Sequence, residues 1–131
     1  MSKFLSGLLV EDNDNGIRMT LRGAMVYHSD LLGDDVKVPC GFTTDFASIP
    51  RPLWAVIPQH GKYDRAAVVH DYLYQNGGYL KNNVLVTVSR KTADDVFNEA
   101  MAVLGVRFTQ RWVIYAGVRI GGHVAWDHYR A

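Results

Sequence analysis

Cysteine, excess charge of one sign and long hydrophobic runs are all scarce in this chain, and each scarcity excludes a class of protein. The single cysteine, Cys40, excludes an internal disulfide framework, so the fold does not need an oxidising compartment. The 14 basic and 13 acidic residues give a net charge of +1, without the basic excess of nucleic-acid-binding proteins. The longest apolar stretch, residues 112–120, contains Arg119 and is far shorter than the ~20 residues that span a bilayer. We therefore expect no nucleic-acid partner and no transmembrane segment.

The sequence also contains no repeat, no low-complexity tract and no linker, and we expect no signal peptide. The apolar run at residues 4–10 is short and is followed by Glu11 and Asp12, without a convincing cleavage site. A length of 131 residues and a hydrophobic fraction of 48% are typical of one globular domain. The sequence therefore predicts a single soluble domain over residues 1–131.

The first third of the chain predicts β-structure. Alternating or β-prone residues indicate strands at residues 17–22, 24–28 and 35–39. A loop rich in Gly, Pro, Thr and Ser follows at residues 38–50. We expect a short helix at residues 52–56, ended by Pro58.

The remainder predicts three main helices, at residues 63–75, 92–104 and 109–120. Thr92 and Asp95 resemble a capping box at the start of the second helix. The third helix is apolar on almost every side, so we expect it to be central and closely packed. Residues 84–88 could form a strand between the first two helices. The expected fold is α+β, with a small N-terminal antiparallel β layer packed on three main helices.

Two of these helices carry polar residues beside their apolar faces. On a helical wheel, His70 lies among apolar neighbours and Asp71 lies at the flank. Asp94 lies at the edge of the apolar stripe of the second helix, while Asp95 points away from it. A His held by a carboxylate from a neighbouring helix can act as a general base, and a second carboxylate beside it can hold a cation. We expect a hydrogen bond between His70 and Asp94.

Arg119 lies on the same side of the third helix as apolar residues. A buried guanidinium is costly unless a carboxylate pairs with it. We therefore expect Arg119 to be largely buried and ion-paired. The candidate partners are Asp45, Asp71, Asp94 and Glu99.

Other interpretations remain open at this point. An inward His can be a core histidine whose hydrogen bonds are satisfied, and Asp45 with Ser48 can simply shape a loop. Cys40 has no neighbouring cue for a base, and Ser48 lacks the sequence context of a hydrolytic serine. His123 and His128 lack a third soft ligand for a metal apart from Cys40.

Three blocks of the sequence resemble a family of phage and prophage proteins catalogued as domain-of-unknown-function family 1353. The blocks lie at residues 38–50, 66–74 and 93–101, and the likeness extends over about residues 17–125. The resemblance implies a phage or prophage origin. It implies no established activity.

A second, local resemblance concerns the pattern from Asp64 to Tyr74 followed by Ala93-Asp94. It is similar to the catalytic helices of phospholipases that cleave the sn-2 ester, above all the form in parvovirus capsid proteins. The resemblance implies that His70 is the general base, that Asp71 binds calcium and that Asp94 orients the His. Tyr74 would match a supporting tyrosine.

The calcium loop of those enzymes lies shortly before the His, whereas the nearest candidate here, Gly41 to Asp45, lies further upstream. With that loop, the divalent-cation ligands would be Asp71, Asp45 and Gly41, supported by Ser48 and Arg119. A phosphohydrolase of the His-Asp superfamily does not fit, because its site needs a different spacing of His and Asp.

Two functions follow from these patterns. The first is a metal-assisted hydrolase acting on a phospholipid or another ester, with His70 and Asp94 as its catalytic pair. The second is a structural or assembly module that contacts other phage proteins and uses the same cluster as a buried network. Either would work in the host cytoplasm or on the virion.

Overall fold

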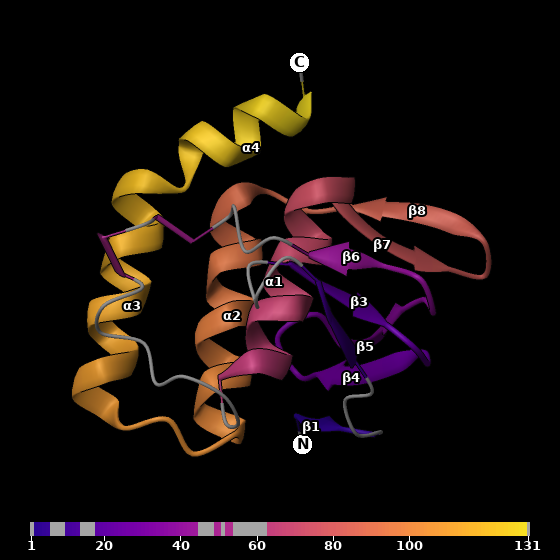
Figure 1. Ribbon diagram of the computed structural model, residues 1–131, viewed down its shortest axis with the longest axis horizontal. Coiled ribbons are helices and arrows are strands. Elements are labelled where there is room, and N and C mark those ends of the chain that lie inside the picture. Colours follow the sequence, from indigo (N-terminus) through magenta and orange to yellow (C-terminus); the bar gives the residue numbers. More distant parts are fainter. Residues whose placement is uncertain are drawn as a thin grey trace.

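The computed structural model describes residues 2–5, 10–13, 18–44, 49–50, 52–53 and 63–130. Within these ranges four helices pack beside three small antiparallel sheets, which confirms the α+β class (Figure 1). The expected short helix at residues 52–56 lies largely outside the described residues. Among the helices that are described, none combines the length and the hydropathy that a bilayer crossing requires.

The strands form two three-stranded sheets and one hairpin. In spatial order, the first sheet contains β1 (Lys3–Phe4), β4 (Met25–Ser29) and β5 (Asp34–Val38), and the second contains β2 (Val10–Asn13), β3 (Arg18–Leu21) and β6 (Thr43–Thr44). The three predicted strands correspond to β3, β4 and β5. Along β4 every second residue is buried, as expected for a strand with one face on the core.

The third sheet is a hairpin of β7 (Gly78–Lys81) and β8 (Val84–Thr87) that projects from the body (Figure 1). The strand suggested by residues 84–88 is therefore present, whereas β7 was not expected. Asn82 and Asn83 both have positive φ, 52° and 64°, as a two-residue hairpin turn requires. A Cβ atom at Gly78 would lie 2.0 Å from the Val86 carbonyl oxygen, so only glycine fits there.

The first two helices begin and end at recognisable signals. Helix α1 (Asp64–Asn76) ends at Gly77, which adopts a left-handed conformation. Helix α2 (Arg90–Val103) begins after Ser89, whose side chain accepts a hydrogen bond from the backbone N–H of Thr92. The predicted capping box of Thr92 and Asp95 is therefore wrong, because Ser89 already satisfies that N–H and the helix starts earlier.

The position of the last long helix differs most from the sequence prediction. Helix α3 (Phe108–Gly121) lies at the outer edge of the molecule rather than at its centre (Figure 1). Only Ile114 and Val118 of this helix are buried, on the side that faces α2. An unexpected fourth helix, α4 (His123–Arg130), follows it and crosses the C-terminal end of α1.

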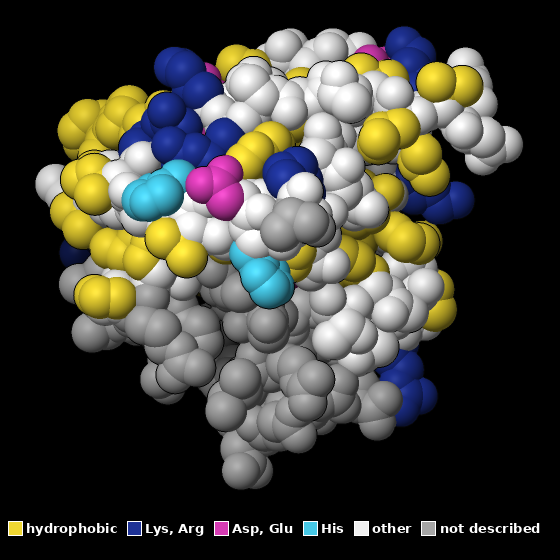
Figure 2. Space-filling view, turned by 90° about the horizontal axis from the view of Figure 1, so that it is seen from above, with side chains coloured by type: hydrophobic (Ala, Val, Ile, Leu, Met, Phe, Trp, Pro, Cys, Tyr) yellow, Lys and Arg dark blue, Asp and Glu magenta, His cyan; other side chains and the backbone are white. Residues whose placement is uncertain are grey.

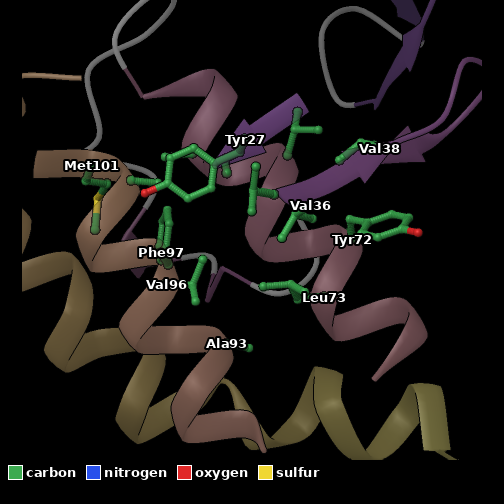
Figure 3. Close-up of a cluster of buried hydrophobic side chains, with 14 of the residues drawn as sticks. Tyr27, Val36, Val38, Tyr72, Leu73, Ala93, Val96, Phe97 and Met101 are labelled. Atoms are coloured by element: carbon green, nitrogen blue, oxygen red, sulfur yellow. The ribbon is translucent and has the colours of Figure 1, made fainter. Parts of the chain in front are cut away.

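The core lies between α1, α2 and the sheet of β4 and β5 (Figure 3). Tyr27 reaches from β4 toward Phe97 of α2, and its hydroxyl donates a 2.7 Å hydrogen bond to Glu99. Leu73 and Tyr72 extend the same cluster from α1. Because α1 is covered on several sides, the polar residues in its middle, His70 and Asp71, are both buried.

Candidate functional site

Helix α1 is buried along nine consecutive residues, from Ala66 to Tyr74. His70 and Asp71 are both within this run and are fully buried. Asp71, which the sequence places at the flank of the apolar face, is therefore buried as fully as His70. A helical wheel assumes one exposed face, whereas strands β5 and β6 and helices α2 and α4 all contact α1.

The expected contact between His70 and Asp94 is present. The Nε2 atom of His70 lies 2.7 Å from Oδ1 of Asp94, and both side chains are fully buried. The Tyr74 hydroxyl donates a 2.6 Å hydrogen bond to the same oxygen. Because a carboxylate can only accept hydrogen bonds, the Nε2 atom of His70 carries its proton in this arrangement.

The second oxygen of Asp94 receives two guanidinium groups. Nη1 of Arg119 lies 2.9 Å from Oδ2, and Nη1 of Arg90 lies 3.4 Å from it. The hydrogen bond to Asp94 raises the pKa of Arg119, so this guanidinium remains charged. The predicted ion pair of Arg119 is thus confirmed. Its predicted burial is only partial, since 31% of the Arg119 side chain is exposed.

Aromatic rings enclose the His70 imidazole. The Phe97 ring stacks on it with centroids 4.3 Å apart, and the Tyr74 ring tilts against it at the same distance. Burial, followed by the charge of Asp94, raises the pKa of Tyr74, so its hydroxyl stays protonated and able to donate. Trp126 of α4 packs edge-on against the Tyr74 ring, with centroids 5.2 Å apart. The imidazole is therefore held in orientation from several sides.

Asp71, the predicted cation ligand, lies near strand β6. Its Oδ2 accepts a 2.8 Å hydrogen bond from Nε2 of Gln75, one turn further along α1. The same nitrogen donates to the carbonyl oxygen of Thr43 at 3.3 Å. Two hard oxygen atoms, one anionic and one a carbonyl, thus converge on one donor, and such oxygens are the ligands that Ca²⁺ prefers.

The remaining predicted residues are only partly placed. Asp45 and Ser48 lie outside the described residues. Gly41 is exposed and has a φ of +90°, a conformation that glycine adopts readily. Within the described ranges no group of three or more His, Cys, Asp or Glu side chains could hold a metal ion. Among the described residues, the structure therefore links Asp71 through Gln75 to Thr43 of the 41–45 loop, but it does not assemble a complete cation site.

The sequence interpretation missed two residues of this cluster. Arg90 lies four residues before Asp94 on α2, and Gln75 lies four residues after Asp71 on α1. Side chains at this spacing share one face of a helix, so the spacing itself could have indicated both. Arg90 also donates hydrogen bonds to the carbonyl oxygens of Val118 and Arg119 at the end of α3.

A family model described as "Protein of unknown function (DUF1353)" matches residues 19–118, which is most of the chain. No curated protein and no solved structure gives a significant match.

Proposed function

We propose that this chain, which belongs to the DUF1353 family, is a phage or prophage protein that hydrolyses an ester with His70 as its general base. The observation that supports the proposal is the shared oxygen of Asp94, which holds His70 at 2.7 Å and Tyr74 at 2.6 Å. This is the arrangement that the resemblance to sn-2 phospholipases implies for His70, Tyr74 and Asp94. A phospholipid is therefore the substrate class that we would test first.

The chemistry follows from the protonation of the imidazole. In the proposed reaction His70 keeps the proton on Nε2 directed at Asp94 and accepts a proton from water on Nδ1. As that proton leaves, the water oxygen forms a bond to the ester carbonyl carbon. The resulting imidazolium returns the proton to the alcohol oxygen when the ester bond breaks, giving one acid and one alcohol. Asp94 orients the ring throughout, and the two arginines hold Asp94 in place.

Asp71 and the loop of residues 41–45 would hold a divalent cation, for which calcium is our choice. The Asp71 carboxylate and the Thr43 carbonyl fit such an ion, because both are oxygen donors that already share one partner. Bound there, the ion would polarise the ester carbonyl as a Lewis acid. Gln75 would have to release one or both oxygens to make room for it.

A specific observation also favours a second function, a phage structural or assembly module. His70 and Asp94 are fully buried, and Asp94 has four donors around it from α1, α2 and α3. The role of such a carboxylate can be purely structural, which is to fix three helices together. Catalysis would require a route for water and substrate to His70.

The two functions differ in what a conservative change at His70 does. For the hydrolase, His70→Gln should lower calcium-dependent cleavage of a phospholipid or a simple ester by about 10²–10⁴-fold, because the general base is lost. The matched control is Asp95→Asn, a neighbouring carboxylate that pairs with Lys91 and Tyr115 instead. It should keep the parent rate. If the parent protein hydrolyses neither substrate, the assembly module becomes the better description.

Calcium binding is measured separately from hydrolysis. A bound ion should stabilise the fold by about 2.7 kcal/mol at 100 times its Kd, as a rise in melting temperature. Asp71→Asn should reduce this rise, whereas Asp95→Asn should not. A parent protein whose melting temperature is unchanged by calcium would remove the cation from the proposal.

A further inference from the structure

The outward face of α3 is apolar although nothing described in the molecule covers it. Phe108 and Ile120 have 66% and 78% of their surface exposed, and Trp112 and Val113 are also exposed. Residues 108, 112, 116 and 120 are one turn apart, so these side chains and Ala116 form one continuous stripe along the helix. We call this stripe, with Val113, the α3 face. Figure 2 shows hydrophobic side chains gathered on the side of the molecule where α3 lies.

The opposite side of α3 is already packed. Ile114 and Val118 are buried, and a Cβ atom at Gly117 would lie 2.2 Å from the Leu53 side chain. A helix that is hydrophobic all round is normally covered all round. The sequence therefore predicts a central helix, while the described part of the fold covers only one side of it. Within the residues that the structure describes the α3 face is uncovered, so we ask what kind of partner would fit it.

The charges around the α3 face indicate what that cover is. No Asp or Glu occurs between residues 100 and 126, whereas Arg107 and Arg111 belong to this segment. Arg119 also belongs to it, but its charge is paired with Asp94. The guanidinium of Arg111 lies 5.5 Å and 5.8 Å from the ring centroids of Phe108 and Trp112, so charge and aromatic surface are side by side. The complementary surface is apolar and carries negative charge.

A second copy of the chain meets this requirement poorly. An antiparallel pairing of two α3 faces about a two-fold axis would keep the flank with Arg111 beside the same flank of the partner. A parallel pairing would set this flank beside the opposite flank of the partner. Neither arrangement offers Arg111 an acidic residue from residues 100–126 as a partner.

We propose that the α3 face docks on the surface of a lipid bilayer that contains anionic headgroups. Amphipathic helices with aromatic and aliphatic residues on one side and Arg or Lys beside them lie in the plane of such a surface. The position of α3 at the outer edge of the molecule lets one helix lie flat on it, without a groove (Figure 1). This inference goes beyond ester hydrolysis and does not depend on it.

The test uses the full chain and vesicles of ether-linked phosphatidylglycerol, which contain no carboxylic ester to hydrolyse, with a chelator present. The protein should sediment with these vesicles, and at least ~10-fold less with ether-linked phosphatidylcholine, because the headgroup charge is lost. Phe108→Glu and Ile120→Glu should each weaken sedimentation by about 10-fold or more. The matched control is Leu80→Glu on the β7–β8 hairpin, since Leu80 is 52% exposed but far from α3.

Circular dichroism and melting temperature establish that the variants are folded, and sedimentation velocity reports the oligomeric state. The proposal is overturned if the parent protein does not bind the anionic vesicles, or if folded Phe108→Glu and Ile120→Glu variants bind as the parent does. It is also overturned if the parent is a dimer that these substitutions dissociate, because a second copy would then cover the α3 face. Equal loss of binding in Leu80→Glu would show that the effect is not specific to α3.

Discussion

At the scale of single residues, Asp94 contributes most to the organisation of the site. It is fully buried and accepts hydrogen bonds from His70 and Tyr74 on one oxygen and from Arg90 and Arg119 on the other. A buried carboxylate is tolerated when its partners replace the water that it has lost. The four donors do this here. Removing the carboxylate changes the surroundings of four groups, whereas removing one donor leaves three in place.

We expect Asp94→Asn to destabilise the fold more than Arg119→Met does. Asparagine would direct an NH₂ group at donors and leave buried hydrogen-bonding groups unsatisfied, at about 1–3 kcal/mol or more. Arg119→Met removes a partly exposed cation and leaves Asp94 with three donors, so its effect should be smaller. Urea unfolding of both variants and the parent measures the difference. Equal stability losses, or a larger loss in Arg119→Met, would contradict this account of Asp94.

The spacing of residues on a helix predicted a contact only where the apolar face of that helix determines which residues are packed together. His70 and Asp94 each lie on or beside an apolar stripe, and packing the stripes together brings the two residues into contact. The full burial of Asp71 could not be predicted from α1 alone, because β5, β6 and α4 also cover this helix. The contact between Gln75 and Thr43 joins residues 32 positions apart, so no local pattern indicates it.

At the scale of elements, Asp34 of β5 connects the β7–β8 hairpin to the first sheet. The Tyr79 hydroxyl donates a 2.7 Å hydrogen bond to Asp34, and Nζ of Lys81 lies 2.8 Å from the other oxygen. These hydrogen bonds, first from Lys81 and then from Tyr79, lower the pKa of Asp34 below its usual 3.8. The charged form of Asp34 is thus favoured in the folded protein over the unfolded one.

This shift has a defined direction with pH. A carboxyl whose pKa is lower in the folded state stabilises the fold above its unfolded pKa, and this contribution is lost as the pH falls through the folded value. The Asp34→Asn variant should therefore have a lower melting temperature than the parent at pH 7. The difference between the two melting temperatures should become smaller below pH 3.8. Melting curves from pH 7 down to pH 2 measure this. A difference that stays constant with pH would mean that the carboxylate charge plays no part.

The elements also differ in how well the sequence predicted them. The first helix, β4 and the strand at residues 84–87 follow from their own residues, because alternation, a helical stripe and a terminal glycine are local signals. The prediction of a capping box was wrong because α2 begins earlier than Thr92. Ser89, three residues before Thr92, is the residue that caps it, and the Ser89 side chain accepts the hydrogen bond from the backbone N–H of Thr92. The short strand β7 has no alternation of its own and exists because β8 pairs with it.

At the scale of the whole molecule, the prediction for α3 failed in a way that is informative. Its composition indicated a helix covered on every side, whereas the part of the chain that the structure describes covers only the side that bears Ile114 and Val118. A pattern of hydrophobic residues indicates that a helix surface is buried. It does not indicate whether the surface is buried against the same chain or against a partner. The fold class could therefore be predicted, whereas the place of α3 in the fold could not.

The contacts of Asp94 have a consequence for how the molecule opens. His70 and Tyr74 belong to α1, Arg90 to α2 and Arg119 to α3, so one carboxylate joins three helices. Local unfolding of any one of these helices would leave some of the buried polar groups around Asp94 without a hydrogen-bond partner. In hydrogen–deuterium exchange, the slowest amides of all three helices should then exchange with similar protection and respond together to denaturant. Asp94→Asn should separate them, with α3 exchanging first, because Ile114 and Val118 are its only fully buried residues. Separate protection levels already present in the parent protein would mean that the three helices open independently.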